Sequence, residues 1–403
     1  MGRTNLIKVF STRIFMNLGN KKGYLDPGTG NALFAALFGI LGSIAYFAKN
    51  AFYLLTGKKN EIFKSNLAIF SEGKMYWIYF RDVVHELIKR KIKFTYYTMD
   101  INDPAFELYD YGNPDADFSL FKVKFVGTGN KGYSAISNLK EENILSTTPN
   151  IGCQGYPIKK PKNCKNLIHI FHGLGFDYKK GSMDNYDTIL LHQSIFTDLF
   201  ASKKVVLAGL PYLDSLIERS AKLQSNTDGK TILVASTWGD RGLLKTYGSK
   251  FILDLANAGY NVIVRPHPYS YIYEKDFIEN LQKEMPGIEF STEIDNLSVL
   301  AKADILISEL SGVRLDFYLA FKRPVISLEC GMSDEFEQNE WLVNIIGNEI
   351  GISVKKEDAE NLPKIVKGLS ERKLIDENSI LANIGKSTTI IADYLESLSN
   401  GRS

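Results

Sequence analysis

The sequence predicts an α/β protein with two parallel, doubly wound halves behind an apolar N-terminal helix. Short apolar runs alternate with amphipathic stretches from about residue 61 onward, which is typical of parallel sheets covered by helices. One polar, turn-rich stretch, Leu223–Lys230, divides this pattern into two halves. A basic head with a long uncharged segment precedes both halves. No internal repeat of fixed period is visible, so the halves share a pattern and not a sequence.

In the first half, an amphipathic helix is predicted over Lys74–Arg90. The predicted strands of this half are Leu67–Phe70, Lys93–Thr98, Lys122–Val126, Asn143–Ser146, Asn166–Phe171, Asp187–Leu191 and Lys204–Ala208. In the second half, the predicted strands are Thr231–Ala235, Asn261–Val264, Gly287–Phe290, Asp304–Ile307 and Pro324–Leu328. The predicted helices between them are Lys245–Ala258, Phe277–Glu284 and Val313–Phe321.

The chain of 403 residues has an ordinary globular composition, with 44% hydrophobic and 23% charged residues. Its net charge of +2 is unevenly distributed, because residues 1–66 hold nine Lys or Arg against two acidic residues. The head therefore carries +7 and the remainder −5, which favours an anionic membrane surface over nucleic acid. The three cysteines have no metal-ligand spacing and indicate a reducing compartment.

Ala32–Ala48 is an uncharged run of seventeen residues, which spans roughly 25 Å as a helix. Continued to Leu55, it becomes long enough for a hydrocarbon core of about 30 Å. We predict a membrane-associated helix at about residues 31–55, as a single span, a re-entrant hairpin or a monotopic anchor. A buried helix of a soluble protein is the alternative. A cleaved signal peptide is disfavoured because the apolar run begins late and lacks a small-residue cleavage site.

Two histidines stand in matching settings, 95 positions apart. His172 follows the strand Asn166–Phe171 in a Phe-His-Gly turn, and His267 follows the strand Asn261–Val264 in an Arg-Pro-His-Pro turn. Ligands of open α/β domains bind at the carboxyl ends of the strands. One imidazole from each half would then reach a single substrate. The alternative is that both are turn residues with local hydrogen bonds.

The segment Ile307–Val313 joins an apolar strand to a helix through hydroxyls and a glycine, a pattern typical of anion sites. Ser308, Ser311 and Gly312 are therefore expected at a phosphate group, with Arg265 supplying positive charge. Ser311 could instead simply cap the helix.

The loop after Ala235 supplies Thr237 and Arg241 as further donors, while Trp238 fits a core position better than a base-stacking one. The segment Gly209–Asp214 reads as a structural turn without a catalytic role.

These segments occur in one order along residues 165–330. They read FHG, GLPYLD, STWGDR, RPHP and SELSGVRLDFYLAFKRPVI. In this order they resemble the CDP-glycerol glycerophosphotransferase family of teichoic-acid and capsule synthesis. The resemblance implies a GT-B-like fold, with two Rossmann-like doubly wound domains facing a cleft. It implies an N-terminal segment over 1–60, an acceptor domain over 61–225 and a nucleotide-donor domain over 226–403.

By the same resemblance, His172 and His267 are catalytic, and Ser308 and Ser311 match the phosphate-binding hydroxyls of the family. From their positions at the strand ends, Arg265 and Gly312 are also expected at the donor phosphates. Thr237, Arg241 and Glu309 belong to the nucleotide or donor loop. The chain departs from the family pattern at three positions. Glu309 stands where Asp is usual, Gly312 where a second Ser is usual, and Phe171 where Trp is common. These changes bear on which alditol phosphate is transferred.

The expected reaction is transfer of glycerol phosphate, or a related alditol phosphate, from CDP-glycerol to a hydroxyl of a lipid-linked glycan, with release of CMP. A histidine base helps to deprotonate the acceptor hydroxyl, and preorganised donors stabilise the charge on the phosphate oxygens. No acidic cluster resembles a magnesium site, so no obligatory metal is expected, and no cofactor is expected. The resemblance also implies work at the cytoplasmic face of the cell membrane. The alternatives are a GT-B glycosyltransferase, a nucleotide-sugar epimerase, or a non-catalytic membrane-bound assembly partner.

Overall fold

A computed structural model describes residues 63–109, 119–174, 181–223, 230–293, 296–309, 311–330, 350–369 and 380–399. The chain divides into two units, Met1–Phe63 and Lys64–Ser403. The helix expected at about residues 31–55 lies outside the described residues. Among the residues that are described, no helix combines the length and the apolar character needed to cross a membrane.

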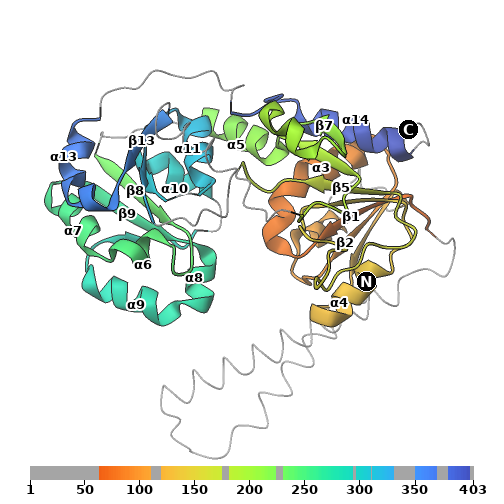
Figure 1. The fold of residues 1–403 in the computed structure, drawn as a ribbon, viewed down its shortest axis with the longest axis horizontal. Helices are drawn as coiled ribbons and strands as arrows, with labels where there is room; N and C mark the ends of the chain where they lie inside the picture. The colour runs from red at the N-terminus through yellow and green to blue at the C-terminus, as the bar shows by residue number, and fades with distance from the viewer. Residues whose placement is uncertain are drawn as a thin grey trace, which may run out of the picture. The chain divides into compact units, whose positions relative to one another are not determined.

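The first sheet has seven described strands, all parallel, in the order β3-β2-β1-β4-β5-β6-β7 (Figure 1). They are β1 (Leu67–Ser71), β2 (Phe94–Thr98), β3 (Phe121–Phe125), β4 (Asn143–Ser146), β5 (Asn166–Ile170), β6 (Thr188–Leu191) and β7 (Lys204–Leu207). The helical elements of this half are η1 (Lys74–Tyr76), α3 (Trp77–Lys89), η2 (Pro104–Tyr109), α4 (Gly129–Ser137), η3 (Ser194–Phe200) and α5 (Pro211–Ala221).

The second sheet has six described strands, again all parallel, in the order β10-β9-β8-β11-β12-β13. They are β8 (Thr231–Ser236), β9 (Asn261–Pro266), β10 (Glu289–Phe290), β11 (Ile305–Ser308), β12 (Val325–Leu328) and β13 (Gly351–Val354). The helical elements are α6 (Leu243–Tyr247), α7 (Lys250–Asn257), α8 (Pro268–Tyr273), α9 (Lys275–Glu284), α10 (Asn296–Lys302), α11 (Val313–Phe321), η5 (Lys356–Asn361) and α13 (Leu362–Lys367).

Both sheets reverse their strand order at one point, between β1 and β4 in the first and between β8 and β11 in the second. This is the Rossmann-like order, and it confirms the two doubly wound halves expected from the sequence. Ligands of such sheets bind outside the carboxyl ends of the strands at the reversal. The loops after β1, β4, β8 and β11 are therefore the places where a site is expected.

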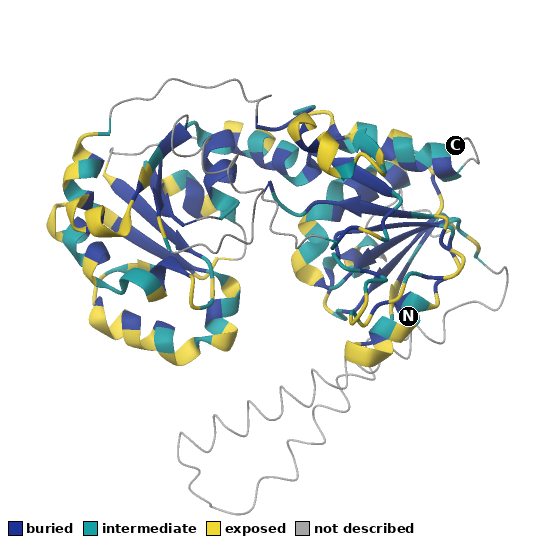
Figure 2. Ribbon diagram, in the orientation of Figure 1, coloured by how far each residue is buried: buried dark blue, intermediate teal, exposed yellow. Residues whose placement is uncertain are grey.

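The strands at these reversal points are buried along their whole length, whereas the outer faces of the helices are exposed (Figure 2). Strands covered by helices on both faces read as continuous apolar runs, which is why Leu67–Phe70 and Ile305–Ile307 were recognisable in the sequence. The sheets thus hold the loops at their carboxyl ends on rigid supports.

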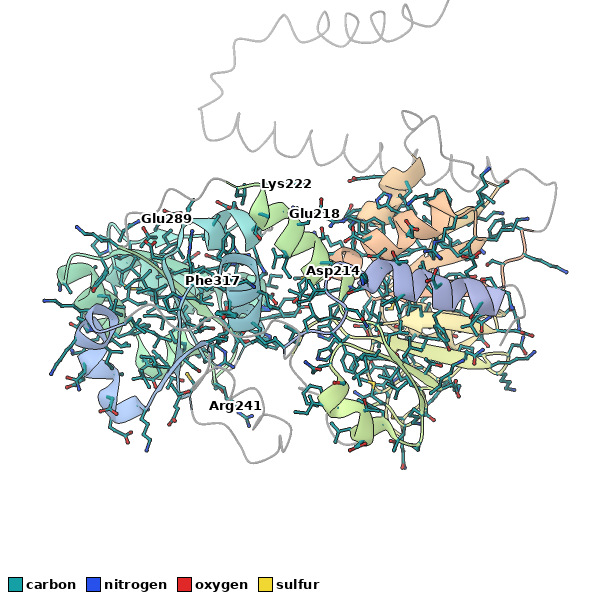
Figure 3. The ribbon with its side chains drawn as sticks, turned by 90° about the horizontal axis from the view of Figure 1, so that it is seen from above. Asp214, Glu218, Lys222, Arg241, Glu289 and Phe317 are labelled. Carbon is teal, nitrogen blue, oxygen red and sulfur yellow. The ribbon has the colours of Figure 1, made fainter. Side chains whose placement is uncertain are left out.

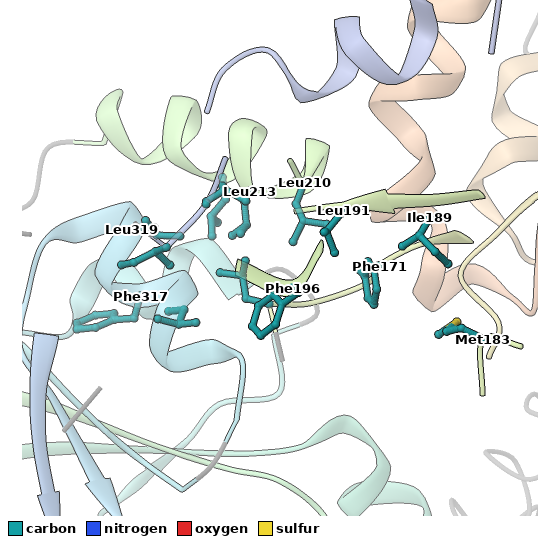
Figure 4. Packing of buried hydrophobic residues seen from close by; sticks show 14 of the residues in the cluster. Phe171, Met183, Ile189, Leu191, Phe196, Leu210, Leu213, Phe317 and Leu319 are labelled. Atoms are coloured by element: carbon teal, nitrogen blue, oxygen red, sulfur yellow. The ribbon is translucent and has the colours of Figure 1, made fainter. Parts of the chain in front are cut away.

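Helices α5 and α11 share one apolar cluster, which joins residues of both halves. Figure 4 shows part of it, from Phe317 and Leu319 on α11 through Leu213 on α5 to Phe171 and Met183. Two hydrogen bonds accompany this packing, because on α5 the Tyr212 hydroxyl donates to Asp316 Oδ1 at 2.6 Å and Ser220 Oγ donates to Ala320 O at 2.8 Å, both on α11. Helix α5 therefore connects the end of the first half to the phosphate-side helix of the second.

The last helix, α14 (Ser387–Ser399), packs on α3 of the first sheet, although sequence analysis assigned residues 226–403 to the donor domain. Asp214 holds its start, because the carboxylate accepts from Gly385 N at 2.7 Å and Ser387 N at 2.9 Å. Figure 3 shows Asp214 beside the first turn of α14. A Cβ on Gly209, which has φ +85°, would lie 2.3 Å from Ser387 Oγ.

The interpretation of Gly209–Asp214 as a plain turn was therefore wrong. Pro211 begins α5 at a position where a missing N–H costs nothing, and Asp214 lies in the first turn of that helix. The predicted helix Lys245–Ala258 also differs, because Gly248, with φ +65°, separates α6 from α7. The predicted helix Val313–Phe321 and the strand Asn143–Ser146 are confirmed at both ends.

Candidate active site

His172 lies two residues after β5, enclosed by aromatic rings. Tyr76 and Tyr79 both approach the imidazole with ring centroids 5.8 Å away, at interplanar angles of 88° and 65°. Burial lowers the pKa of His172, and a hydrogen bond with the backbone of Thr147 opposes the shift. The imidazole is therefore neutral at pH 7, the form in which a histidine can accept a proton.

His267 caps helix α8. Its Nδ1 accepts a hydrogen bond from Tyr269 N at 3.1 Å, so the neutral ring carries its proton on Nε2. Burial, followed by the neighbouring Arg265, lowers the pKa of His267. A neutral imidazole held in this tautomer offers one N–H donor. That arrangement suits contact with a phosphate oxygen better than proton abstraction.

Arg265 is buried at the end of β9 and braces the loop that follows β10. Its guanidinium donates to Ser291 Oγ at 3.3 Å and to Asn296 Oδ1. Two N–H groups of the guanidinium are therefore already hydrogen-bonded to other residues of the protein. Its positive charge still acts on His267, whereas a direct phosphate contact stays a prediction.

Ser308 ends β11 at the reversal point of the second sheet, and Glu309 directly follows it. Glu309 Oε1 accepts from Thr237 N, which follows β8, so one hydrogen bond spans the reversal point. Ser308 Oγ and Glu309 Oε2 are buried and have no hydrogen-bond partner among the described residues. Burial raises the pKa of Glu309 to about 7, and the Thr237 N–H opposes this rise. Both groups could therefore bond to a ligand.

A buried arginine, which was not among the residues predicted from the sequence, stabilises the turn before α11 by hydrogen bonds. Arg314, only 1% exposed, donates from Nε to Ser311 O at 3.1 Å and from Nη1 to Ser327 Oγ. Gly312 occupies the N-cap position, and no side-chain hydrogen bond caps α11. The alternative interpretation of Ser311 as the helix cap is therefore wrong. An arginine in a mostly apolar helix, two residues before Asp316, was the available signal.

The loop after β8 carries Thr237, Trp238 and Arg241. Glu274 stabilises it by accepting from Gly239 N at 3.1 Å and from Lys245 Nζ at 2.7 Å. Arg241 is exposed on this loop (Figure 3). Trp238 is 45% exposed and meets the rings of Tyr269 and Tyr273 on α8, so the expectation that it lies in the core was wrong.

Tyrosines connect the surroundings of the two histidines. Burial raises the pKa of Tyr76 to about 12, and the electrostatic contributions that follow come from Glu72 and Tyr269. Tyr76 thus contacts the His172 ring and also lies within electrostatic range of Tyr269, whose ring centroid is 5.2 Å from that of His267. Tyr76 is therefore the described residue that links the surroundings of the two histidine turns, whereas the meeting of both imidazoles on one substrate stays a prediction.

A segment of the chain that contains part of this site matches a known family. Residues 183–334 match the family model of CDP-Glycerol:Poly(glycerophosphate) glycerophosphotransferase. This match confirms the resemblance and the class of enzyme that the motifs predicted, a glycerophosphotransferase that uses CDP-glycerol. The matched segment contains His267, Ser308 and Ser311, whereas His172 lies before it. No curated protein sequence matches the chain.

Solved structures share the fold. The wall teichoic acid polymerase TagF has a TM-score of 0.52 at 16% identity, covering 92% of this chain and 98% of its own. A UDP-GlcNAc 2-epimerase from Methanocaldococcus jannaschii has 0.53 at 14%, covering 82% and 99%. A putative UDP-N-acetylglucosamine 2-epimerase from Listeria monocytogenes has 0.55 at 14%, covering 84% and 98%. At these identities the likeness shows the fold alone.

We expect His267→Asn to weaken CDP-glycerol binding about 10- to 100-fold, the loss typical of a hydrogen bond to a charged group. Asparagine is itself a good N-cap, so α8 should keep its start and the thermal midpoint should change little. Calorimetric titration with CDP-glycerol measures the affinity. Equal affinity in the wild type and the variant would remove His267 from the phosphate site.

Proposed function

We propose that this chain transfers glycerol phosphate from CDP-glycerol to a hydroxyl of a membrane-linked glycan or polymer, with release of CMP. The polymer would be of the teichoic-acid or capsule type, and the work would be done at the cytoplasmic face of the cell membrane. The observation that carries the proposal is the position of Tyr76, which contacts the His172 ring and lies within electrostatic range of Tyr269 beside His267, in a chain whose residues 183–334 match the glycerophosphotransferase family.

The geometry supports a division of labour between the halves. The neutral imidazole of His172 takes the proton of the acceptor hydroxyl, whose oxygen attacks the distal phosphorus of the donor. The bond from that phosphorus to the bridging oxygen breaks, and CMP leaves with the electron pair. His267 Nε2–H, Ser308 Oγ and the turn before α11 stabilise the charge on the phosphate oxygens. The fold would then be used as in GT-B enzymes, with donor and acceptor on opposite halves.

A donor screen tests the proposal. We expect purified protein to release CMP from CDP-glycerol and to leave UDP-sugars unchanged. The epimerase alternative has support from the fold alone, through the two 2-epimerase structures named above. Release of UDP, or epimerisation of UDP-GlcNAc, without CMP release from CDP-glycerol would favour that alternative.

Deleting residues 1–60 should move the protein to the soluble fraction without loss of donor binding. The motivation is the uncharged run Ala32–Ala48 in a head of net charge +7, followed by a unit, Lys64–Ser403, that is compact by itself. Membrane flotation and calorimetric titration with CDP-glycerol measure the two outcomes. Membrane binding of the shortened protein, or loss of donor affinity in a folded one, would contradict this role of the head.

A further inference from the structure

Glu72 is a carboxyl group at the reversal point of the first sheet, and the reaction above gives it no role. It directly follows β1, whose carboxyl end lies beside that of β4. In the second sheet, the equivalent position at the reversal point is occupied by the Thr237–Glu309 hydrogen bond. Ligands of such sheets bind at this edge. Burial raises the pKa of Glu72, and Thr148 and Tyr156 beside it oppose the rise.

The surroundings of Glu72 lead directly to His172. Tyr156 donates from its hydroxyl to Glu72 Oε1 at 3.2 Å, which fixes one side of the carboxylate. Glu72 acts electrostatically on Tyr76, and the ring of Tyr76 lies edge-on to the imidazole of His172. The carboxylate, two phenols and the candidate base therefore form one polar group on the first half. This is the half on which the acceptor is expected.

A carboxylate in this setting suits a particular kind of ligand. It offers only acceptor positions when ionised, so it favours ligand groups that donate hydrogen bonds, above all hydroxyls. Its hydrogen bonds to them are stronger than those between neutral groups. A hydroxyl beside the attacking one would be such a donor, as in a polyol or a sugar.

We propose that Glu72 is a specificity-determining residue that binds the acceptor through the hydroxyl neighbouring the one that attacks phosphorus. This inference rests on the proposed function, since it takes the first half as the acceptor side and His172 as the base. Glu72 takes part in no bond-making step. It holds the acceptor so that the attacking hydroxyl faces His172, and it thereby favours diol ends over simple alcohols.

Two synthetic acceptors test this role with the full chain, saturating CDP-glycerol and pH 8. 3-Octyloxypropane-1,2-diol carries the neighbouring hydroxyl, and 3-octyloxypropan-1-ol lacks it. The wild type should prefer the diol in kcat/KM by about 10- to 100-fold, as for a hydrogen bond to a charged group. Glu72→Ala should reduce the preference to about twofold or less, and Glu72→Gln, which keeps one acceptor oxygen, should fall between them.

Glu141→Gln is the matched control. Glu141 is also a buried carboxyl bonded by a tyrosine, Tyr97, at 2.7 Å, but it lies just before β4, at the opposite end of the sheet from His172. It should keep the full preference. If Glu72→Ala is unstable, Tyr156→Phe provides the second variant and should lower the preference in the same direction, because it releases one side of the carboxylate.

The outcomes separate the two proposals. No CMP release from CDP-glycerol by the wild type would overturn the proposed function, and this inference with it. Transfer by the wild type with an unchanged diol preference in Glu72→Ala would overturn only the role of Glu72. If calorimetry showed weaker CDP-glycerol binding by Glu72→Ala, the residue would belong to the donor site, and its proposed role in acceptor binding would be contradicted.

Discussion

Replacing His172 by glutamine should lower kcat about 10²- to 10⁴-fold, the range typical of general-base catalysis, while the affinity for CDP-glycerol stays unchanged. Glutamine keeps a polar group of similar reach but cannot take a proton. A base contributes in the transition state, so its loss appears in kcat and not in donor binding. The position of His172, on the first half and before the matched residues 183–334, agrees with this expectation.

The pH profile gives a second readout. Because burial lowers the pKa of His172 from its usual value, the neutral form of the imidazole predominates at pH 7, and the wild-type rate should change little from pH 7 to 8. His85→Gln is a suitable control, since His85 is exposed on α3 and should not affect kcat. A folded His172→Gln protein that retains most of its activity at pH 7–8 would show that the base lies elsewhere.

The second large effect is expected at Arg314. Arg314→Ala should lower the free energy of unfolding by about 3–5 kcal/mol, as for other buried charged groups whose partners are left unpaired. Ser311 O and Ser327 Oγ would lose their donor, and a cavity would remain behind the turn that begins α11. Because that turn is expected to bind phosphate, affinity for CDP-glycerol should fall as well. Chemical denaturation and calorimetric titration measure the two effects.

Lys250→Ala provides the comparison for stability. Lys250 makes an exposed ion pair with Asp254 at 2.7 Å on α7, and exposed pairs of this kind contribute little to the free energy of unfolding. An Arg314→Ala protein no less stable than Lys250→Ala would show that the buried guanidinium does not brace the turn. A destabilised variant with unchanged donor affinity would separate that turn from the phosphate site.

The sheets could be predicted because their signal is local. Strands buried on both faces carry short continuous apolar runs, so the apolar centres of Asn143–Ser146 and Ile305–Ser308 stand out from their neighbours. Helix α14 could not be assigned to its sheet in the same way. Its partners in the first half, such as Leu67 and Phe80, lie some three hundred residues earlier, and no local pattern records that packing. The helix start at Pro211 was missed because turn and helix-start residues look alike.

The same difference between local and long-range signals applies to the residues of the site. Strand ends indicated His172, His267 and the segment from Ser308 to Gly312, because ligands bind where parallel strands end. Glu72 and Arg314 were not selected, since their importance comes from tertiary contacts with Tyr156 and Ser327, which lie on other elements of the fold. Arg265 was expected to face phosphate, but it also braces Ser291 and Asn296, a use that only tertiary structure reveals.

The central claim is that a glycerol phosphate unit moves intact from CDP-glycerol to an acceptor hydroxyl. CDP-glycerol labelled with ³²P at the distal phosphorus and with ¹⁴C in glycerol tests it most directly, with 3-octyloxypropane-1,2-diol as the acceptor. The account predicts that both labels appear in the acceptor product in the ratio of the donor, together with one unlabelled CMP for each transfer. Transfer of ¹⁴C without ³²P, or consumption of the donor with neither label in the product, would contradict it.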